Sequence, residues 1–299
     1  MESRNTISAG SCSDHRIAIL GCGEMGSMIA QALLRSGRYA RERIVATVKH
    51  AKKATSIAES TGIKVLTSNA DATREADIVI LCVKPQQALG VLGQISGVLK
   101  PSAIVVSIVT ALSSADIEQC VGGTARVVRA MPNTACRVGA GMTALCRGTY
   151  AEPDCMSTVG EMFGLMGKTA EVDEQWMDAV TALSASSPAF MYVILEALTD
   201  GGVRAGLPRE LAALLASQAM FGAASMQMEE ATHPALLKGE VTTPGGCTID
   251  GILELEAGGI RATLIRAIST TAAKARQMRV AVNDSQAPSS PQLPSPARP

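Results

Sequence analysis

Short apolar runs alternate with amphipathic stretches along the first part of the chain, up to about residue 170. Residues 77–83 are apolar almost without interruption, which is typical of a parallel strand buried on both faces. Residues 52–61 have helical spacing and end at Gly62. Strands that alternate with helices in this way predict a doubly wound, mostly parallel sheet. The predicted strands are residues 16–20, 44–48, 63–66, 77–83, 104–109 and 127–130.

The pattern changes after residue 171, where strand-like runs stop and only helical spacing remains. Ala, Gly and Ser are abundant in this second part, which allows helices to pack closely. It is therefore predicted to be an all-helical domain and a candidate for dimerisation. The predicted helices are residues 173–183, 188–201, 208–228, 248–256 and 261–278.

The first predicted strand leads directly into a glycine motif. Residues 21–26 read Gly-Cys-Gly-Glu-Met-Gly, and a helical pattern follows over residues 27–35. A strand, G-x-G-x-x-G and a helix form the context in which this motif binds a dinucleotide. Gly21 makes the tight turn, Gly23 lets the backbone approach a pyrophosphate, and Gly26 lets the helix pack on the strand. The alternative is a tight turn between strand and helix that binds nothing.

These patterns predict an α/β protein with an N-terminal Rossmann-like doubly wound sheet and an all-helical C-terminal dimerisation domain. The two ends of the chain have no regular pattern, and the C-terminal end is rich in Pro and Ser. The predicted divisions are a flexible arm over residues 1–14, a dinucleotide-binding domain over 15–172, a helical dimerisation and substrate domain over 173–282, and a disordered tail over 283–299.

The turn after the second predicted strand carries no acidic residue. An NAD-dependent enzyme usually ends this strand with Asp or Glu, which binds the ribose 2′-hydroxyl. Here residues 48–53 read Val-Lys-His-Ala-Lys-Lys, and Val48 and Lys49 are expected beside the adenosine ribose. A charged hydrogen bond to a 2′-phosphate contributes about 1.5–3 kcal/mol, so NADPH is the preferred cofactor and NADH the alternative. Equally, the lysines of this turn can form a solvated face.

Composition excludes several classes of function. The formal net charge is zero, from 27 basic and 27 acidic residues, which argues against a nucleic-acid-binding surface. The eight cysteines include no Cys-x-x-Cys pair and the three histidines are scattered, so neither a metal site nor a disulfide framework is expected. No apolar run reaches the length of a membrane span, and residues 1–14 lack a secretory signal. The expected location is the cytoplasm, without membrane attachment.

Residues 241–256 look like a glycine-containing turn that opens a helix. Thr242 and Thr243 are candidate N-cap residues, and Pro244 fits a first helical turn. Two glycines follow, and they let the backbone come close to a ligand. The free amides of a helix N-terminus bind carboxylate or phosphate, and Thr248 adds a hydroxyl that both donates and accepts. The alternative is a helix start that only packs.

Taken together, these motifs resemble pyrroline-5-carboxylate reductase, the enzyme that completes proline synthesis, across about residues 15–280. The resemblance implies reduction of 1-pyrroline-5-carboxylate to L-proline by hydride transfer from NADPH. It also implies an obligate intertwined homodimer, often assembled into a ring of dimers. The matching stretches are residues 19–26, 82–86, 128–134, 196–203 with 206–209, and 243–249 with 255–256.

The resemblance also implies the site residues. In the family the turn matching Gly245, Gly246 and Cys247 binds the substrate carboxylate, and the threonine matching Thr248 hydrogen-bonds the ring nitrogen as the catalytic residue. Asn69, on the loop after the third strand, is expected to flank the dinucleotide. The expected cofactor-binding residues are Leu20, Gly21, Cys22, Gly23, Glu24, Met25, Gly26, Val48, Lys49, Asn69, Cys82, Val83, Lys84 and Pro85.

The chain departs from the family pattern at two places. The segment usually written Gly-Ser-Gly-Pro-Ala-Tyr corresponds to residues 184–190, where the glycines are replaced and Phe190 lacks the tyrosine hydroxyl. Any role for that hydroxyl is therefore excluded. Cys247 stands where the family usually has Ala or Thr, at a helix N-terminus that can activate a thiol. We interpret it as a small packing residue rather than a redox switch.

Other classes share parts of this pattern. The β-hydroxyacid dehydrogenases need a catalytic Lys on the first interdomain helices, but residues 173–203 contain no Lys. Prephenate-linked or deazaflavin-linked NADP oxidoreductases are a more distant alternative. A dinucleotide sensor without turnover, or a reductase of another cyclic imine, also fits the glycine motif. The intact turn before Thr248 argues against a sensor, because a sensor has no use for a carboxylate site.

Overall fold

The structure is a computed structural model that describes residues 14–284. It divides into two compact units, one containing the chain up to Ala185 and again from Ala272, the other containing Ser186–Thr271. Most of the predicted arm and most of the predicted tail lie outside the described residues.

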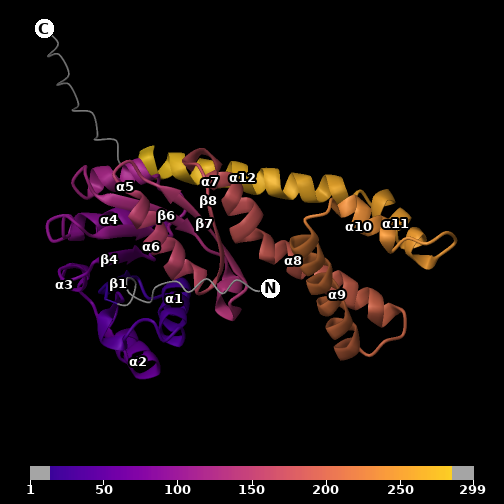
Figure 1. Ribbon diagram of the computed structural model, residues 1–299, viewed down its shortest axis with the longest axis horizontal. Coiled ribbons are helices and arrows are strands. Elements are labelled where there is room, and N and C mark those ends of the chain that lie inside the picture. Colours follow the sequence, from indigo (N-terminus) through magenta and orange to yellow (C-terminus); the bar gives the residue numbers. More distant parts are fainter. Residues whose placement is uncertain (1–13, 285–299) are drawn as a thin grey trace, which may run out of the picture. The chain divides into compact units, whose positions relative to one another are not determined.

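The first unit is built on one eight-stranded sheet with the order β3-β2-β1-β4-β5-β6-β7-β8. The order reverses between β1 and β4, the arrangement of a doubly wound sheet, and β1 pairs in parallel with both β2 and β4. The predicted α/β class is confirmed (Figure 1). The strands found at the predicted places are β1 (Ile17–Leu20), β2 (Ile44–Thr47), β3 (Lys64–Leu66), β4 (Ile78–Leu81), β5 (Ile104–Ser107) and β6 (Arg126–Met131).

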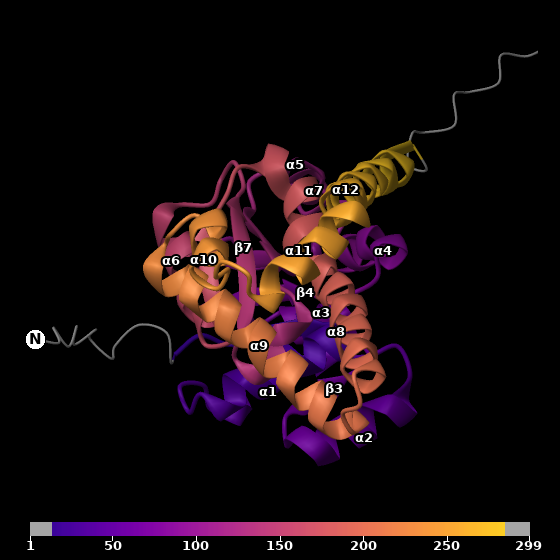
Figure 2. The ribbon, with the colours of Figure 1, turned by 90° about the vertical axis from the view of Figure 1, so that its right-hand side faces the viewer.

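Alternate residues of the central strands face two separate cores. Ile17 and Ile19 lie in one core with Phe163, whereas Ala18 and Leu20 lie in the other. This alternation explains the continuous apolar runs, because both faces of each central strand are covered by helices (Figures 1 and 2). The helices of this unit include α1 (Glu24–Arg35), α2 (Ala51–Thr61), α3 (Asn69–Thr73), α4 (Pro85–Ile95), α5 (Ser114–Cys120) and α6 (Pro153–Gly164).

Two strands were not predicted. β7 (Gly141–Arg147) runs antiparallel to β6, and β8 (Gly167–Glu171) runs parallel to β7 at the sheet edge. Their residues are largely Gly, Ala, Thr and Lys, which have little of the apolar, β-branched character of the central strands. They form because β6 offers an unpaired edge, a tertiary effect that local sequence does not encode.

The predicted helix over residues 173–183 is interrupted. The structure has a 3-10 turn at Glu174–Trp176, α7 at Met177–Val180 and a π-helical segment at Thr181–Ser186. The Thr181 hydroxyl donates to the Met177 carbonyl oxygen over 2.7 Å, a contact that competes with the regular helical hydrogen bonds. The segment that departs from the family pattern therefore begins within a π-helical turn, a feature frequent at functional sites.

The second unit is entirely helical, as predicted. Gly202 lets α8 and α9 pack closely, since a Cβ at this position would lie 2.9 Å from the Ala212 Cβ. α10 was not predicted, because seven residues are too few to establish a period. The elements are α8 (Ser187–Arg204), α9 (Arg209–Glu230), α10 (Pro234–Glu240), α11 (Cys247–Ala257) and the start of α12 (Ile260–Asp284).

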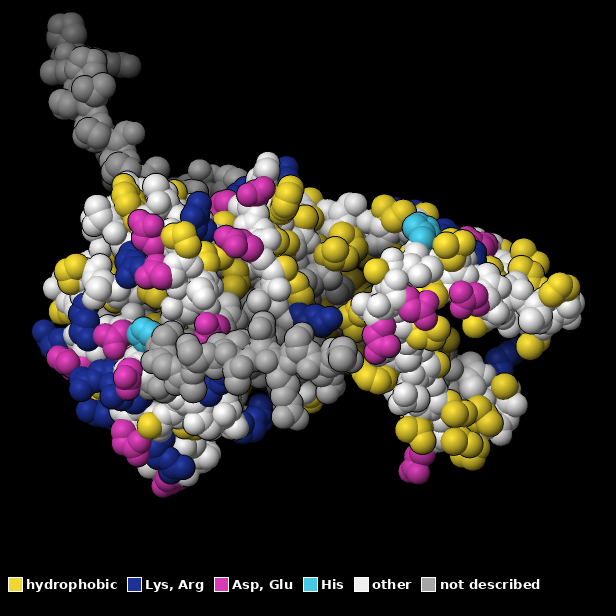
Figure 3. Space-filling view, viewed as in Figure 1, with side chains coloured by type: hydrophobic (Ala, Val, Ile, Leu, Met, Phe, Trp, Pro, Cys, Tyr) yellow, Lys and Arg dark blue, Asp and Glu magenta, His cyan; other side chains and the backbone are white. Residues whose placement is uncertain are grey.

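The helices of the second unit leave large apolar side chains uncovered. α8, α10 and α11 have no buried residue, and Ala212 is the buried residue of α9. Figure 3 shows hydrophobic side chains gathered over this unit. A single chain rarely exposes so much apolar surface, so these faces need a cover. Large exposed residues include Tyr192, Val193, Leu198, Leu214, Leu215, Phe221, Met228, Leu253 and Leu255.

The prediction concerned uninterrupted apolar runs, but two of the described helices are long and apolar enough on average to cross a membrane by length and composition alone. Glu174–Arg204 and Arg209–Glu230 both meet these two criteria. The expectation counted only uninterrupted apolar runs, whereas these helices are apolar on average with isolated polar residues. Their exposed faces are the same ones that lack a cover in the second unit.

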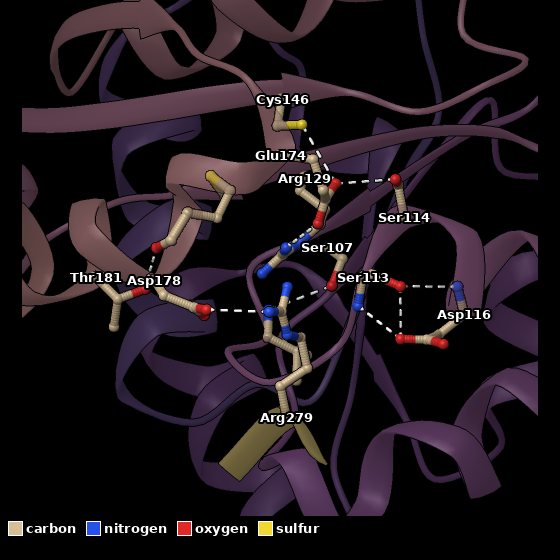
Figure 4. A network of polar contacts seen from close by, with 12 residues as sticks. Ser107, Ser113, Ser114, Asp116, Arg129, Cys146, Glu174, Asp178, Thr181 and Arg279 are labelled. Atoms are coloured by element: carbon tan, nitrogen blue, oxygen red, sulfur yellow. Dashed lines mark hydrogen bonds and ion pairs between the residues drawn. The ribbon is translucent and has the colours of Figure 1, made fainter. Parts of the chain in front are cut away.

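A buried ion pair ties β6 to the segment before α7. Arg129 Nη1 donates to Glu174 Oε1, while Ser114 Oγ and Cys146 Sγ donate to Glu174 Oε2 over 2.9 and 3.3 Å. In Figure 4 all three side chains point toward the Glu174 carboxylate. Asp178 forms a neighbouring ion pair with Arg279 of α12 over 3.2 Å. Burial by itself raises the Glu174 pKa, but Arg129 and the other donors outweigh burial, so this pKa lies below its usual range.

Glycine is required where β7 and β8 meet. A Cβ on Gly167 would collide with the Gly141 carbonyl oxygen, and Gly167 has a φ of +144°. We expect Gly167→Ala to lower the free energy of unfolding by at least about 2 kcal/mol, through strain and displaced backbone. The urea midpoint measures the effect. Gly164→Ala is the control, since a Cβ there meets no atom within 4 Å. Equal midpoints for the two variants would contradict this interpretation.

Replacing Glu174 with Gln should leave Arg129, which is 4% exposed, without its counter-charge. Removing one partner of a buried pair costs about 3–5 kcal/mol, and we expect the lower end because Glu174 is 30% exposed. The lowered pKa means that the wild-type pair stabilises above the unfolded carboxyl pKa of about 4.3 and loses this contribution as pH falls through the folded pKa.

Urea unfolding of Glu174→Gln at pH 7 and in acid measures both effects. The variant should be less stable at pH 7, and the difference from wild type should shrink below about pH 4. Glu171→Gln, an exposed carboxylate on β8, is the control and should match wild type at both pH values. A constant difference across the pH range would rule out a charge contribution from Glu174.

Candidate active site

The glycine motif forms a turn with no room for side chains at its first and third glycines. Gly21 has a φ of +93°, and a Cβ on it would lie 2.6 Å from Val83 Cγ1. A Cβ on Gly26 would lie 2.6 Å from the Gly21 carbonyl oxygen. Gly23, in contrast, faces open space, since a Cβ on it would meet no atom within 4 Å. This is the arrangement that a dinucleotide pyrophosphate needs, so the turn fits the cofactor.

The start of α1 offers backbone amides to an anion. Gly23 is its N-cap and supplies no side-chain cap, so the N–H groups of Glu24, Met25 and Gly26 are left for a ligand. Cys22 is 1% exposed, and its thiol lies 3.4 Å from the Ser27 hydroxyl. Leu20 and Cys22 therefore have side chains in the core, and only their backbone is available to a cofactor.

A pocket of about 330 Å³ lies next to this turn, and we call it the adenosine pocket. Five expected cofactor-binding residues line it, together with six that were not expected. Among the described residues that line the adenosine pocket there is no Asp or Glu. Lys49 therefore makes the charge of the pocket positive. The lining residues are Gly21, Thr47, Val48, Lys49, Thr67, Asn69, Val83, Gln87, Gly90, Val91 and Gln94.

A chain of hydrogen bonds crosses the adenosine pocket. The Gly21 N–H donates to Thr47 Oγ1 over 3.1 Å, and the Thr47 hydroxyl donates to Asn69 Oδ1 over 2.6 Å. Asn69 Nδ2 then donates to Gln94 Oε1 over 2.8 Å. Asn69 is not on a loop as expected but is the first residue of α3, because Ser68 caps that helix through the Asp71 N–H.

The loop after β4 brings two expected cofactor residues, Cys82 and Val83, beside the turn, since a Cβ on Gly21 would lie within 3.1 Å of both. Lys84 is the N-cap of α4, and Pro85 is its first residue. Burial raises the pKa of the half-buried Cys82 thiol, so this thiol stays protonated and is not a nucleophile. Lys84 does not line the adenosine pocket.

The end of β6, in the stretch 128–134 that carries part of the family resemblance, is fixed by one amide side chain. Asn133 Oδ1 accepts from the Ala135 and Met142 N–H groups over 3.2 and 3.4 Å. Its Nδ2 donates to the Ser184 carbonyl oxygen over 3.2 Å. Asn133 therefore connects β6 to the π-helical segment, so the segment that departs from the family pattern is placed beside this strand end. Sequence spacing gave no signal for that contact.

In the second unit, the turn before α11 differs from the predicted capping. The Gly246 N–H donates to the Thr243 carbonyl oxygen over 3.0 Å, and Gly245 has a φ of +71°. With Pro244 before Gly245, these are the features of a type II turn. The N-cap is therefore Gly246, and the predicted capping by Thr242 and Thr243 is wrong.

Two interactions explain this correction. The Thr242 hydroxyl donates to the Lys238 carbonyl oxygen over 2.8 Å, so it belongs to the end of α10. A Cβ on Gly246 would collide with Thr243 Oγ1, so this hydroxyl lies against the glycine backbone. The turn brings Gly245, Gly246, Cys247 and Thr248 together at the start of α11.

The start of α11 has free polar groups. Gly246 supplies no side-chain cap, so the first amides of the helix are left for an anion. Cys247 is exposed. Within residues 14–284 the Thr248 hydroxyl makes no hydrogen bond, so it is free to bind a ligand. These groups suit a small carboxylate with an adjacent ring nitrogen.

Two family models match the chain. Residues 174–278 match the model described as pyrroline-5-carboxylate reductase dimerisation. Residues 16–111 match the model described as NADP oxidoreductase, coenzyme F420-dependent. The second match covers only the part of the chain that carries the glycine turn and the adenosine pocket, so it concerns nucleotide binding. The first covers α8 to α11 and thus the helices with uncovered apolar faces.

Curated relatives and solved structures agree with the first match. The pyrroline-5-carboxylate reductase of Glycine max is 39% identical over 88% of this chain and 96% of its own length. That of Methanosarcina acetivorans is 36% identical over 89% and 98%. The structure of the Plasmodium falciparum pyrroline carboxylate reductase with NADP bound aligns with a TM-score of 0.82 and 30% identity, over 89% of this chain and 99% of that one.

More distant structures share only the fold. The prephenate dehydrogenase of A. aeolicus aligns with a TM-score of 0.52 at 15% identity. The glycine turn, the acid-free pocket and the turn before α11 occur together in a chain that aligns over almost its full length with these reductases. The chain therefore belongs to the pyrroline-5-carboxylate reductase family.

Proposed function

We propose that this chain reduces 1-pyrroline-5-carboxylate to L-proline with NADPH, the last step of proline biosynthesis. One observation carries the proposal: the glycine turn before α1 and the uncapped turn before α11 occur together in a chain 39% identical to a named reductase over 88% of its length. A dinucleotide sensor would need only the first turn. The uncapped amides and free hydroxyl at the start of α11 support a second, smaller ligand.

In the proposed mechanism, the first unit binds the cofactor through its backbone. The amides at the start of α1 hold the pyrophosphate, and Lys49 lies beside the phosphate on the adenosine ribose. The bound cofactor supplies a hydride from its dihydronicotinamide ring. Asn133 fixes the end of β6, which we place near that ring in the bound state. These residues bind and orient the cofactor, and none of them needs to transfer a proton.

The turn before α11 binds the substrate. The amides of Cys247 and Thr248 would hold the carboxylate of the cyclic imine, while the Gly246 N–H closes the turn on the Thr243 carbonyl oxygen. The Thr248 hydroxyl would orient the ring nitrogen or relay its proton. A protonated imine accepts hydride at carbon readily, so the reaction needs no strong acid. This agrees with a site built from amides and one hydroxyl instead of a His or Asp constellation.

We further propose that a second copy of the chain covers the apolar faces of α8 and α9, giving a homodimer that can assemble into a ring of dimers. The dimerisation model that matches residues 174–278 supports a homo-oligomer. Seven free cysteines among the described residues are typical of a reducing compartment, which supports a cytoplasmic location. Lipid is the rival cover for these faces, and a monodisperse oligomer in detergent-free buffer would exclude it.

The direct test follows nicotinamide absorbance of the purified full chain with NADPH, with and without pyrroline-5-carboxylate. Substrate-dependent oxidation and formation of proline are the expected results. Binding of NADPH without oxidation would instead favour the dinucleotide sensor or a reductase of another cyclic imine. A panel of cyclic imines with and without a ring carboxylate separates these two alternatives.

Thr248→Val removes the hydroxyl and keeps the shape of the side chain. If Thr248 orients the ring nitrogen, kcat/KM should fall by about 10- to 100-fold, which corresponds to about 1–3 kcal/mol. If it relays the proton, kcat itself should fall by about 10²–10⁴. Steady-state kinetics in saturating NADPH distinguish the two. Thr158→Val on α6 is the control, and wild-type kinetics for Thr248→Val would remove Thr248 from the mechanism.

Lys49→Ala removes the cation of the adenosine pocket. We expect the Kd for NADPH to rise by roughly tenfold, because one charged hydrogen bond of about 1.5–3 kcal/mol is lost, while the Kd for NADH changes little. Fluorescence titration of both cofactors measures this. Lys168→Ala on β8 is the matched control. Equal losses for NADPH and NADH would show that Lys49 does not bind the 2′-phosphate.

A further inference from the structure

We infer that Gln94 is a specificity-determining residue that favours a dinucleotide carrying a phosphate on its adenosine ribose over one with a free 2′-hydroxyl. This inference rests on the proposed function, since it concerns the cofactor of that reaction. Gln94 lies on α4 and lines the adenosine pocket together with Lys49 and Asn69. No sequence motif marks it.

The hydrogen bonds of Asn69 determine which groups face the pocket. Its Oδ1 accepts from the Thr47 hydroxyl over 2.6 Å, and its Nδ2 donates to Gln94 Oε1 over 2.8 Å. The Thr47 hydroxyl itself accepts from the Gly21 N–H. The four groups thus form one chain of three hydrogen bonds from the glycine turn to α4. In this arrangement the Asn69 oxygen faces Thr47 and the Gln94 oxygen faces Asn69.

That orientation leaves hydrogen-bond donors for a ligand. An amide NH₂ group has two hydrogens, so Asn69 keeps one N–H beyond its bond to Gln94. Because Gln94 uses its oxygen for Asn69, its own NH₂ group remains, and among the described residues that group has no partner. Gln94 is exposed and Asn69 half-buried at this pocket, so a ligand can reach both groups.

The charges in the pocket point to an anionic group on the ligand. Lys49 lines the adenosine pocket. Among the described residues that line this pocket, none carries a carboxylate. A phosphate gains from a nearby cation and several N–H donors, whereas a neutral hydroxyl gains little from the cation. A carboxylate at position 94 would keep the acceptor for Asn69 but replace the free NH₂ with negative charge. Gln94→Glu therefore tests the selection of NADPH over NADH with the least change in the shape of the side chain.

The experiment titrates the full-length wild type and Gln94→Glu with NADPH and with NADH by isothermal calorimetry. The Kd for NADPH should rise by at least about tenfold, and that for NADH should stay within about threefold. The loss for NADPH should shrink at about 1 M salt, because salt screens an exposed charge. An unchanged ratio of the two Kd values would overturn the inference.

Two further variants separate charge from other effects. Gln119→Glu makes the same change on an exposed position of α5 outside the pocket, and both Kd values should match wild type. Gln94→Leu removes the acceptor without adding charge, so the preference for NADPH, which is the Kd for NADH divided by the Kd for NADPH, should fall less than in Gln94→Glu. An equal fall would overturn the role of charge.

The result of this binding experiment does not depend on whether the protein reduces pyrroline-5-carboxylate. If the wild type binds NADPH but does not oxidise it with pyrroline-5-carboxylate, the proposed function fails while the role of Gln94 is still decided by the Kd ratio. If turnover is normal and Gln94→Glu keeps the wild-type ratio, the role of Gln94 fails alone.

Discussion

The close backbone packing around Gly21 is the constraint on which the cofactor end of this protein depends. β1, α1 and the loop after β4 meet there with no room for a further side chain, because a Cβ on Gly21 would lie 2.6 Å from Val83 Cγ1 and a Cβ on Gly26 would lie 2.6 Å from the Gly21 carbonyl oxygen. The sheet order reverses between β1 and β4, so this contact stands at the point where doubly wound sheets bind ligands. The same turn donates its Gly21 N–H to Thr47, and that bond begins the chain that orients Asn69. The position of the Gly21 N–H is thus connected, through these hydrogen bonds, to the side chain of Asn69 in the adenosine pocket.

The two units differ in how their apolar side chains are buried. In the first, helices on both faces of the sheet bury the alternate residues of β1 and β4 within one chain. In the second, α8 and α9 keep residues such as Val193 and Phe221 about two-thirds exposed. Such helices are stable only when another surface completes them. In the proposed homodimer, folding of the second unit and assembly would therefore be coupled, and the stability of this part of the chain would depend on protein concentration.

The sequence predicted the central sheet well because β1, β4 and β5 are buried on both faces and have to be apolar throughout. It could not predict β7 and β8, whose Gly, Thr and Lys residues form strands only because β6 offers an edge. The same limit applies to the site. Gly21 and Lys49 stand in a recognisable local pattern, whereas Gln94 meets Asn69 only after α4 has packed on the sheet. The capping of α11 was mispredicted because the positive φ of Gly245, which selects a type II turn, competes with a helix start at Pro244.

The distribution of thiols has a practical consequence. Burial raises the pKa of Cys22, Cys136 and Cys155, and burial with the nearby Glu174 charge raises that of Cys146 to about 12. Among the described cysteines, Cys247 is the exposed one, and it lies directly beside the proposed substrate turn. Thiolates react and protonated buried thiols do not. In a chain with Cys12 and the partly exposed Cys82 and Cys120 replaced by serine, a maleimide dye would therefore attach at Cys247, and its fluorescence would report in real time on whatever enters or leaves that turn.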